Sequence, residues 1–268
     1  MNKHLLFIML LFSQVAFSQV SDLLVSSMAI ANTSTARTDT WTAFHNPASL
    51  VQATGWQVAA QYENHYLTAE LSTAMVQAAY CNRYLNVGLG YSFFGYDEWN
   101  EMMATVSFSR RFGRFSIGLA ADLIAVYAGR ERGYRLTAVP QIGVTVDATD
   151  TWTIGFETFN PFIQQLPDAA NSRSLPAVYR LGSDWRFRHD MRWDVEVSYD
   201  VNSTFCVATG YEWRAIEQLT AKVGVYYKQY FVACLGLAVH FGHFTIDLGA
   251  ELHPILGLCP QTRLAVCY

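Results

Sequence analysis

The chain has 268 residues, of which 15% are charged and 15% aromatic, and its formal net charge is −4. Soluble domains usually carry about 25% charged residues, so this composition is unusual for one. The negative balance and the lack of a basic cluster exclude nucleic acid as a partner. The five cysteines include no C-x-x-C pair, so neither a zinc site nor a disulfide framework is indicated. A single bridge, such as Cys259 with Cys267, stays open in an oxidising compartment.

Residues 1–18 have the pattern of a secretory signal peptide. A short basic start is followed by an apolar run that ends at Phe17, and the small residues Ala16 and Ser18 stand where a signal peptidase reads the chain. The apolar run is too short for a membrane-spanning helix, which needs about 20 residues. We therefore expect Gln19 to be the first residue of the mature protein.

The clearest structural signal is a two-residue alternation of apolar and polar side chains. In residues 191–200 the odd positions are apolar or aromatic and the even positions are polar or charged, and the pattern returns in 205–213, 219–227 and 244–252. Successive side chains of a strand point to opposite faces of its sheet. The second face often holds Gly, Ala, Ser or Thr rather than charges, which favours a wall with lipid outside and a narrow, filled lumen inside.

Residues 56–268 are predicted to form an all-β domain, a transmembrane antiparallel up-and-down barrel of about 14 strands. An even number of strands is typical of single-chain bacterial barrels. The predicted strands leave no room for a second domain. The predicted strands are 56–64, 70–80, 84–94, 101–111, 114–127, 134–147, 151–159, 176–187, 190–200, 203–213, 217–228, 230–241, 243–252 and 261–268.

Alternate connections of such a barrel lie on opposite sides of the membrane, with short turns in the periplasm and longer loops outside. The expected periplasmic turns are 82–83, 113–114, 147–150, 188–189, 215–216 and 242–243. The expected outer loops are 95–100, 129–133, 160–175 and 253–261.

The segment before the barrel carries one motif, an aromatic residue followed by an Asn-Pro-Ala turn, formed by Phe44, Asn46, Pro47, Ala48 and Leu50. Here the chain resembles the outer-membrane family that includes the long-chain fatty acid transporter FadL and the PorV and PorQ barrels of the type IX secretion system. The usual glycine of that motif is replaced by Ser49. The resemblance implies that residues 19–55 fold as a hatch inside the barrel lumen. Pro47 restricts Asn46, whose side chain can satisfy backbone groups of a buried loop.

Polar residues at inward positions of the predicted strands are the remaining candidates for a site. They are Asp122, Asp194, Glu196, Glu212, Lys222, Asp247, Glu251 and Arg263. Their mixed signs favour ion pairs that pack the lumen and hold the hatch, while a polar pathway or a proton-sensitive gate is the alternative. His45 has no nucleophile or ligand cluster beside it, so no catalytic residue, metal site or cofactor is predicted, and the chain is not expected to be an enzyme.

These observations place the chain in the outer membrane of a Gram-negative bacterium, in contact with lipid. The family resemblance implies a barrel that binds a small hydrophobic molecule or passes it across the membrane. The alternative is a subunit or docking platform of an envelope machine, of the type IX secretion or outer-membrane assembly kind, with proteins as partners. The modest length of the largest outer loop, 160–175, keeps both hypotheses open.

Overall fold

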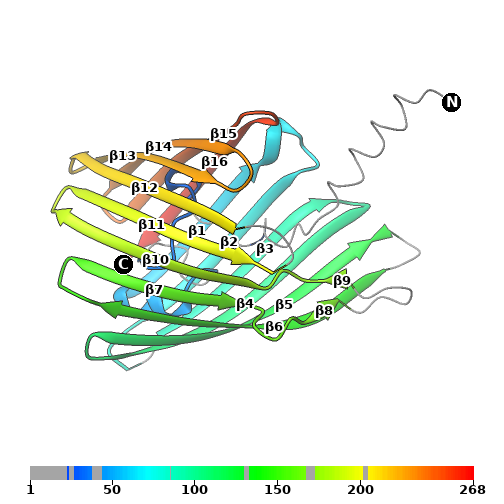
Figure 1. The fold of residues 1–268 in the computed structure, drawn as a ribbon, viewed down its shortest axis with the longest axis horizontal. Helices are drawn as coiled ribbons and strands as arrows, with labels where there is room; N and C mark the ends of the chain where they lie inside the picture. The colour runs from blue at the N-terminus through cyan, green and yellow to red at the C-terminus, as the bar shows by residue number, and fades with distance from the viewer. Residues whose placement is uncertain are drawn as a thin grey trace.

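A computed structural model describes Leu23 and residues 27–37, 44–84, 86–129, 133–166, 173–201 and 205–268 (Figure 1). The predicted signal peptide, residues 1–18, lies outside the described residues, as does part of the predicted hatch. Within the described part of the chain, no helix combines the length and apolar character needed to cross a membrane.

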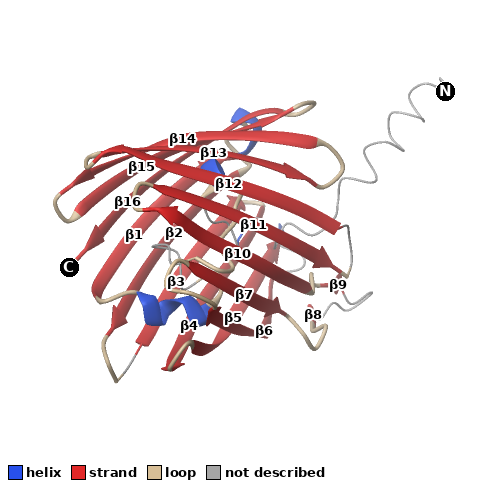
Figure 2. Ribbon diagram, turned by 60° about the vertical axis from the view of Figure 1, so that its left-hand side comes forward, coloured by secondary structure: helices blue, strands red, loops and turns tan. Residues whose placement is uncertain are grey.

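Fourteen antiparallel strands close into one barrel, in which each strand pairs with its neighbours in the chain and the first pairs with the last (Figures 1 and 2). This architecture confirms the predicted strand number. The barrel strands are β1 (Gly55–Asn64), β2 (Ser72–Cys81), β3 (Asn86–Tyr96), β4 (Trp99–Phe112), β5 (Phe115–Ala128), β6 (Tyr134–Asp147), β7 (Trp152–Phe159), β10 (Val178–Arg188), β11 (Met191–Asp200), β12 (Phe205–Ile216), β13 (Leu219–Tyr227), β14 (Phe231–Phe241), β15 (Phe244–His253) and β16 (Gly257–Cys267).

Two further strands, β8 (Gln165–Leu166) and β9 (Arg173–Ser174), form a small separate hairpin between β7 and β10. The described residues also form three 3-10 helices, η2 (Met28–Ile30), η3 (Pro47–Gln52) and η4 (His65–Leu67). The barrel closes where β1 pairs with β16, and Trp56 and Tyr268 exchange two backbone hydrogen bonds of 2.8 Å there. The C-terminal residue is therefore fixed in the wall.

Large apolar side chains cover the outside of the wall, while the inward face is buried. Along β5, Leu119 and Leu123 are 56% and 50% exposed, whereas Asp122 and Ile124, on the alternate positions, are 1% and 0% exposed. A soluble barrel would carry polar residues on its exposed face, so an outer surface of leucine, valine and aromatic residues is typical of a wall in lipid.

The expectation that the outer connections are the longer ones is wrong for two of the four named loops. β3 and β4 pair up to Tyr96 and Trp99, which reduces the loop at 95–100 to a two-residue turn. The loop at 253–261 is likewise shortened because β16 begins at Gly257. Gly95 and Gly257 have φ angles of 107° and 102°, a backbone conformation that L side chains rarely adopt.

Turns at the opposite end of the barrel also differ from their predicted positions: those predicted at 147–150 and 188–189 each lie one residue later, at 148–151 and 189–190. β12 extends to Ile216, so a third turn lies at 217–218 rather than at 215–216. The pairing of β12 with β13 shifts register between Arg214 and Ile216. A bulge of this kind adds a residue to one strand, and alternation alone does not reveal it.

Candidate functional site: the interior of the barrel

The described residues of the N-terminal segment pack against the inward face of the strands. Nearly all of residues 27–37 and 44–53 are buried. η2 contacts β12 to β15, and η3 contacts β2 to β6. Segments far apart in sequence therefore meet inside the barrel, and the geometry of these contacts defines the candidate site.

Glycines make room for this segment on the inner wall. They face each other in four cross-strand pairs, which are Gly118 with Gly143, Gly155 with Gly182, Gly210 with Gly224, and Gly236 with Gly249. At each of these positions, a Cβ atom would come within 4 Å of an atom of residues 29–48. The paired glycines thus form a smooth belt on which the backbone of the N-terminal segment lies.

The glycine belt gives a test of close packing. A Cβ atom at Gly143 would overlap the side-chain oxygen of Asn46, whereas at Gly249 the nearest atom, the backbone nitrogen of Ala29, would be 3.3 Å away. Gly143→Ala is therefore expected to lower the free energy of unfolding by about 1–3 kcal/mol and to expose the N-terminal segment to protease. Gly249→Ala should change both much less. Equal effects in denaturant titration and proteolysis would show that the segment is not packed tightly on the belt.

The motif residues occupy the centre of this packing. The Asn46 amide donates to the carbonyls of Thr35 and Val144 at 2.7 and 3.2 Å, and its oxygen accepts from the Ala48 backbone N–H at 3.0 Å. This capping bond begins η3, with Pro47 at its first position, where no backbone donor is needed. Asn46 therefore connects residue 35, the start of η3 and strand β6.

The apolar members of the motif fill space on either side of that turn. Phe44 and Leu50 are completely buried, and the Phe44 ring lies against Gly90. Leu50 packs with Ala53, Ala79 and Cys81. His45 contributes its backbone carbonyl, which accepts from the Gln141 side chain at 2.8 Å.

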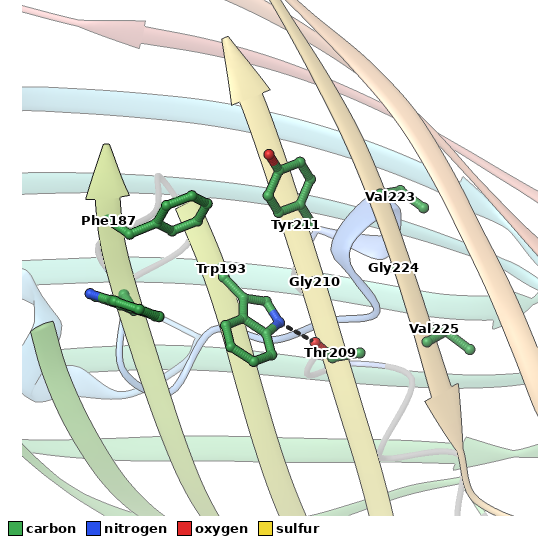
Figure 3. A pocket seen from close by; sticks show the side chains of 9 residues that line it. Phe187, Trp193, Thr209, Gly210, Tyr211, Val223, Gly224 and Val225 are labelled. Atoms are coloured by element: carbon green, nitrogen blue, oxygen red, sulfur yellow. Dashed lines mark hydrogen bonds between the residues drawn. The ribbon is translucent and has the colours of Figure 1, made fainter. Parts of the chain in front are cut away.

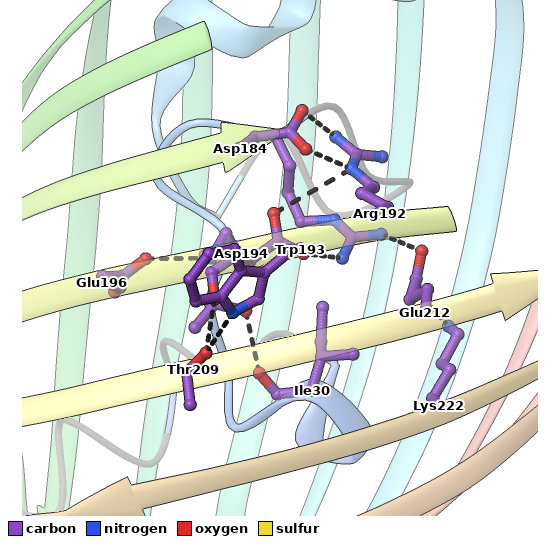
Figure 4. A network of polar contacts seen from close by, with 12 residues as sticks. Ile30, Asp184, Arg192, Trp193, Asp194, Glu196, Thr209, Glu212 and Lys222 are labelled. Atoms are coloured by element: carbon purple, nitrogen blue, oxygen red, sulfur yellow. Dashed lines mark hydrogen bonds and ion pairs between the residues drawn. The ribbon is translucent and has the colours of Figure 1, made fainter. Parts of the chain in front are cut away.

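A chain of ion pairs links the N-terminal segment to strands β11, β12, β13, β15 and β16. Figure 4 shows the part of it around Asp194, Glu212 and Lys222. Arg37 donates to Asp194 and Glu212 at 2.8 Å each, and all three side chains are largely buried. Lys222 lies 3.4 Å from Glu212 and also pairs with Asp247, which in turn pairs with Arg263. Each carboxylate therefore bridges two cations, an arrangement that compensates their burial.

The same segment is held through its backbone. The Glu196 carboxylate accepts hydrogen bonds from the N–H groups of Ser34 and Thr35 at 2.9 and 3.0 Å. Hydrogen bonds to a charged acceptor are stronger than those between neutral groups. Glu196 thus holds the backbone of residues 34 and 35, while the ion-pair chain holds the side chain of Arg37.

Besides Glu196, two of the predicted lumen residues lie apart from the ion-pair chain. Asp122 is buried and accepts from the Thr105 hydroxyl at 2.5 Å. Glu251 accepts from the Tyr226 hydroxyl at 2.7 Å. The prediction had missed Arg37 and the pair of Arg192 with Asp184, joined by bonds of 2.6 and 2.5 Å. Arg192 and Asp184 are on the inward positions of β11 and β10, so the alternation contained the signal for them.

A polar cavity of about 670 Å³ opens at the end of the barrel that carries the turns 148–151 and 189–190. Members of the ion-pair chain, including Arg37, Lys222 and Arg263, form its inner wall. Arg37 is the residue through which the N-terminal segment takes part in the lining of this cavity.

The opposite half of the lumen contains an apolar cluster beside buried polar side chains such as Glu101 and Gln141. Its buried cluster includes Phe94, Met103, Ile124, Val139 and Phe159. Phe159 is the last residue of β7 and Phe94 is near the end of β3, so the cluster lies at the end that carries η4 and the 160–177 connection. The interior thus holds an apolar cluster toward one end and the ion-pair chain toward the other, and the N-terminal segment contacts the first through Phe44 and the second through Arg37.

His65 of η4 packs on this apolar end. Its ring makes an edge contact with Phe94 at 5.7 Å, and Nε2 lies 3.2 Å from the Thr73 hydroxyl. Burial lowers the pKa of His65 to about 4, so the ring is neutral at pH 7. His65 Nε2 also lies 3.4 Å from the buried Glu63 carboxylate, so the ring contacts polar as well as apolar groups.

Metal ligation and disulfide bonding in the described part of the interior depend on where its histidine, cysteine and acidic side chains lie. In the ranges that the structure describes, no group of three or more His, Cys, Asp or Glu side chains is arranged to hold a metal ion. All five cysteines are free thiols, including Cys259 and Cys267.

Comparisons with known proteins identify the fold. No protein-family model and no curated protein sequence matches the chain. Among solved structures, the CymD monoaromatic hydrocarbon channel matches with a TM-score of 0.70 and 11% identity, over 92% of this chain and 98% of that one. The Pseudomonas putida toluene transporter TodX matches with a TM-score of 0.67 and 11% identity, over 92% and 99%.

A FadL homologue of Pseudomonas aeruginosa matches with a TM-score of 0.64 and 13% identity, over 88% of this chain and 95% of that one. These similarities cover nearly the whole length of each barrel. The chain therefore has the fold of the FadL-type outer-membrane hydrocarbon channels, a closed antiparallel barrel of fourteen strands.

Proposed function

We propose that the chain is a non-enzymatic outer-membrane barrel that binds a small hydrophobic molecule and passes it across the membrane. The observation that carries the proposal is the apolar cluster inside one end of the lumen, around Phe94, Met103 and Phe159. Apolar side chains inside a barrel otherwise filled with polar groups favour an apolar ligand. Two of the matched structures, a monoaromatic hydrocarbon channel and a toluene transporter, agree with this ligand class.

In this proposal residues 19–55 are the hatch of the barrel. Phe44, Asn46, Pro47, Ala48 and Leu50 form its rigid turn, and the burial and hydrogen bonds of that turn support the role. The inward polar residues hold the hatch to the wall or pack the lumen around it. They are Asp122, Asp194, Glu196, Glu212, Lys222, Asp247, Glu251 and Arg263.

The orientation follows the rule for bacterial barrels. The end with the turns 113–114, 148–151 and 242–243 would face the periplasm, and the end with 160–177 would face outside. The apolar cluster would then receive the molecule from outside, and the polar cavity would be its exit.

A docking platform of an envelope machine, related to PorV and PorQ, is the second candidate. The short outer connections favour it, because the turns at 97–98 and 254–256 provide little chain with which to enclose a dry pocket. Exposed apolar side chains at the same end, Leu67, Phe231 and Ile255, would then meet a protein partner.

Purification from native outer membrane in a mild detergent, with mass spectrometry of the retained molecules, distinguishes the two functions. The transport proposal predicts a bound hydrophobic molecule that is lost in Met103→Gln, because Met103 is buried in the apolar cluster. Met102→Gln is the matched control, since Met102 is the neighbouring residue of β4 outside that cluster. A stoichiometric protein partner without a retained hydrophobic molecule would favour the platform and contradict the transport proposal.

A further inference from the structure

The polar cavity at the end of the barrel with the turns 148–151 and 189–190 is lined by more cations than carboxylates. Seven of its lining side chains are arginine or lysine, and four are aspartate or glutamate. Its volume of about 670 Å³ falls within the range of about 300–1,000 Å³ that is common for ligand sites. Passage of an apolar molecule gives no reason for an excess of cations here.

The inner part of the cavity is electrically balanced. Arg37, Lys222 and Arg263 meet the three carboxylates of the ion-pair chain. Arg192 is held by Asp184 through two hydrogen bonds of 2.6 and 2.5 Å (Figure 4). Four cations therefore meet four carboxylates, and the excess comes from the rest of the lining.

Strands β11 and β12 carry aromatic rings on their outer face and charged groups on their inner face. Trp193 and Tyr211 line an apolar groove on the outer face (Figure 3). Arg192 and Glu212, which are their neighbours in the chain, line the cavity inside. Arg214 stands two positions after Glu212 and lines the cavity as well, as the alternation of strand side chains requires.

Three arginines at the mouth of the cavity, Arg186, Arg188 and Arg214, make up the excess. Arg186 is 48% exposed and lies 4.0 Å from Asp184, which is already held from β11. Arg188 is 58% exposed and lies 3.1 Å from Asp190. The Arg214 backbone N–H donates to the Asp190 carbonyl at 2.8 Å, so Arg214 lies beside the same turn; it is exposed and forms no ion pair within the described ranges. Asp190 is thus the carboxylate that these three guanidinium groups share.

The remaining acidic residue of the lining does not offset this charge. Asp150 is 99% exposed and lies 3.9 Å from Arg114, a turn residue outside the lining. The mouth therefore keeps an excess of about two positive charges. Guanidinium groups recognise carboxylate and phosphate through paired N–H donors, and they keep their charge at any physiological pH.

We propose that the mouth of the polar cavity binds a small hydrophilic polyanion, a molecule with two or more carboxylate or phosphate groups, at Arg186, Arg188 and Arg214. A single acidic group would compete with Asp190 for one guanidinium. Two or more acidic groups pair with several guanidinium groups at once and balance the excess charge. The inference goes beyond the proposed transport, because the site lies apart from the apolar cluster and its chemistry excludes an apolar ligand.

Isothermal titration calorimetry of the full-length barrel in a nonionic detergent tests the site. Citrate and pyrophosphate are titrated separately at pH 7 and low ionic strength, with acetate as the singly charged comparison. We expect at least one polyanion to bind, and acetate to bind at least tenfold more weakly. R186Q and R214Q together should weaken polyanion binding by roughly tenfold for each arginine. Added salt should weaken it further, because these side chains are exposed.

Arg114→Gln is the matched control, because Arg114 is 69% exposed at the same end of the barrel but outside the cavity lining. Heat-modifiable mobility verifies that each variant is folded. Binding of neither polyanion, equal affinity for acetate, an affinity that survives loss of Arg186 and Arg214, or a loss that also occurs in R114Q would overturn the proposal. So would an acidic peptide that binds where both small polyanions fail. No hydrophobic molecule is titrated, so these outcomes leave the transport proposal unaffected.

Discussion

Arg37→Ala is expected to lower the free energy of unfolding by about 3–5 kcal/mol, the usual cost of removing one partner from a buried ion pair. Arg37 is 5% exposed and contacts Asp194 and Glu212 at 2.8 Å. Its loss would leave Asp194, itself 3% exposed, with only the more distant Arg192 at 3.9 Å. Equilibrium unfolding of the barrel in detergent micelles, followed by electrophoretic mobility, measures the effect.

Two further variants separate charge from packing. Arg37→Met combined with Asp194→Asn and Glu212→Gln removes the cation and both carboxylates, so it should recover much of the lost stability. Arg114→Ala should cause no measurable change, because the Arg114 pair with Asp150 is solvent-exposed and 3.9 Å long. If Arg37→Ala were as mild as Arg114→Ala, residue 37 would not be anchored in the wall.

Leu237→Arg is expected to cost about 2–4 kcal/mol, because a charge at the middle of the lipid face must leave water. Leu237 is central in β14 and 49% exposed. Phe241→Arg, at the end of the same strand and 58% exposed, should cost about 0–1 kcal/mol, since the penalty falls toward the interface. Unfolding in lipid vesicles compares the two variants. An equal cost, or a larger one at Phe241, would contradict the proposed depth of β14.

The strand positions could be predicted because each strand has one apolar face that is directed outward. The predicted ranges overlap all fourteen strands of the barrel, and 134–147 coincides with β6. Prolines obscured the start of β16, since proline is usually absent from strand interiors. Pro260 pairs with β15 but lies one residue outside the pairing with β1, where a missing N–H breaks no bond on that side. The proline is visible in the sequence, but the point at which the pairing with β1 ends is known only from the structure.

Alternation predicts which side chains point into the lumen. It does not predict how far along the barrel each one lies or which residue it contacts. Alternation assigns Asp122 and Asp194 alike to the inward side, yet Asp122 contacts Thr105 and Asp194 contacts Arg37. The difference depends on which residues lie beside each strand across the lumen. Arg37 and Asp194 are 157 positions apart in the sequence. Their meeting requires the closed barrel and the path of the N-terminal segment over the paired glycines.

Ion conductance in planar bilayers tests most directly whether the N-terminal segment closes the lumen. The variant lacks residues 21–49 and keeps the signal peptide; it removes η2, Arg37 and the Asn46-Pro47 turn together. Backbone pairing between strands closes the wall independently, so the variant should fold into a heat-modifiable barrel. Its conductance should exceed that of the intact protein. Unchanged conductance of a folded barrel would contradict closure by this segment, and loss of folding would show that the segment belongs to the wall.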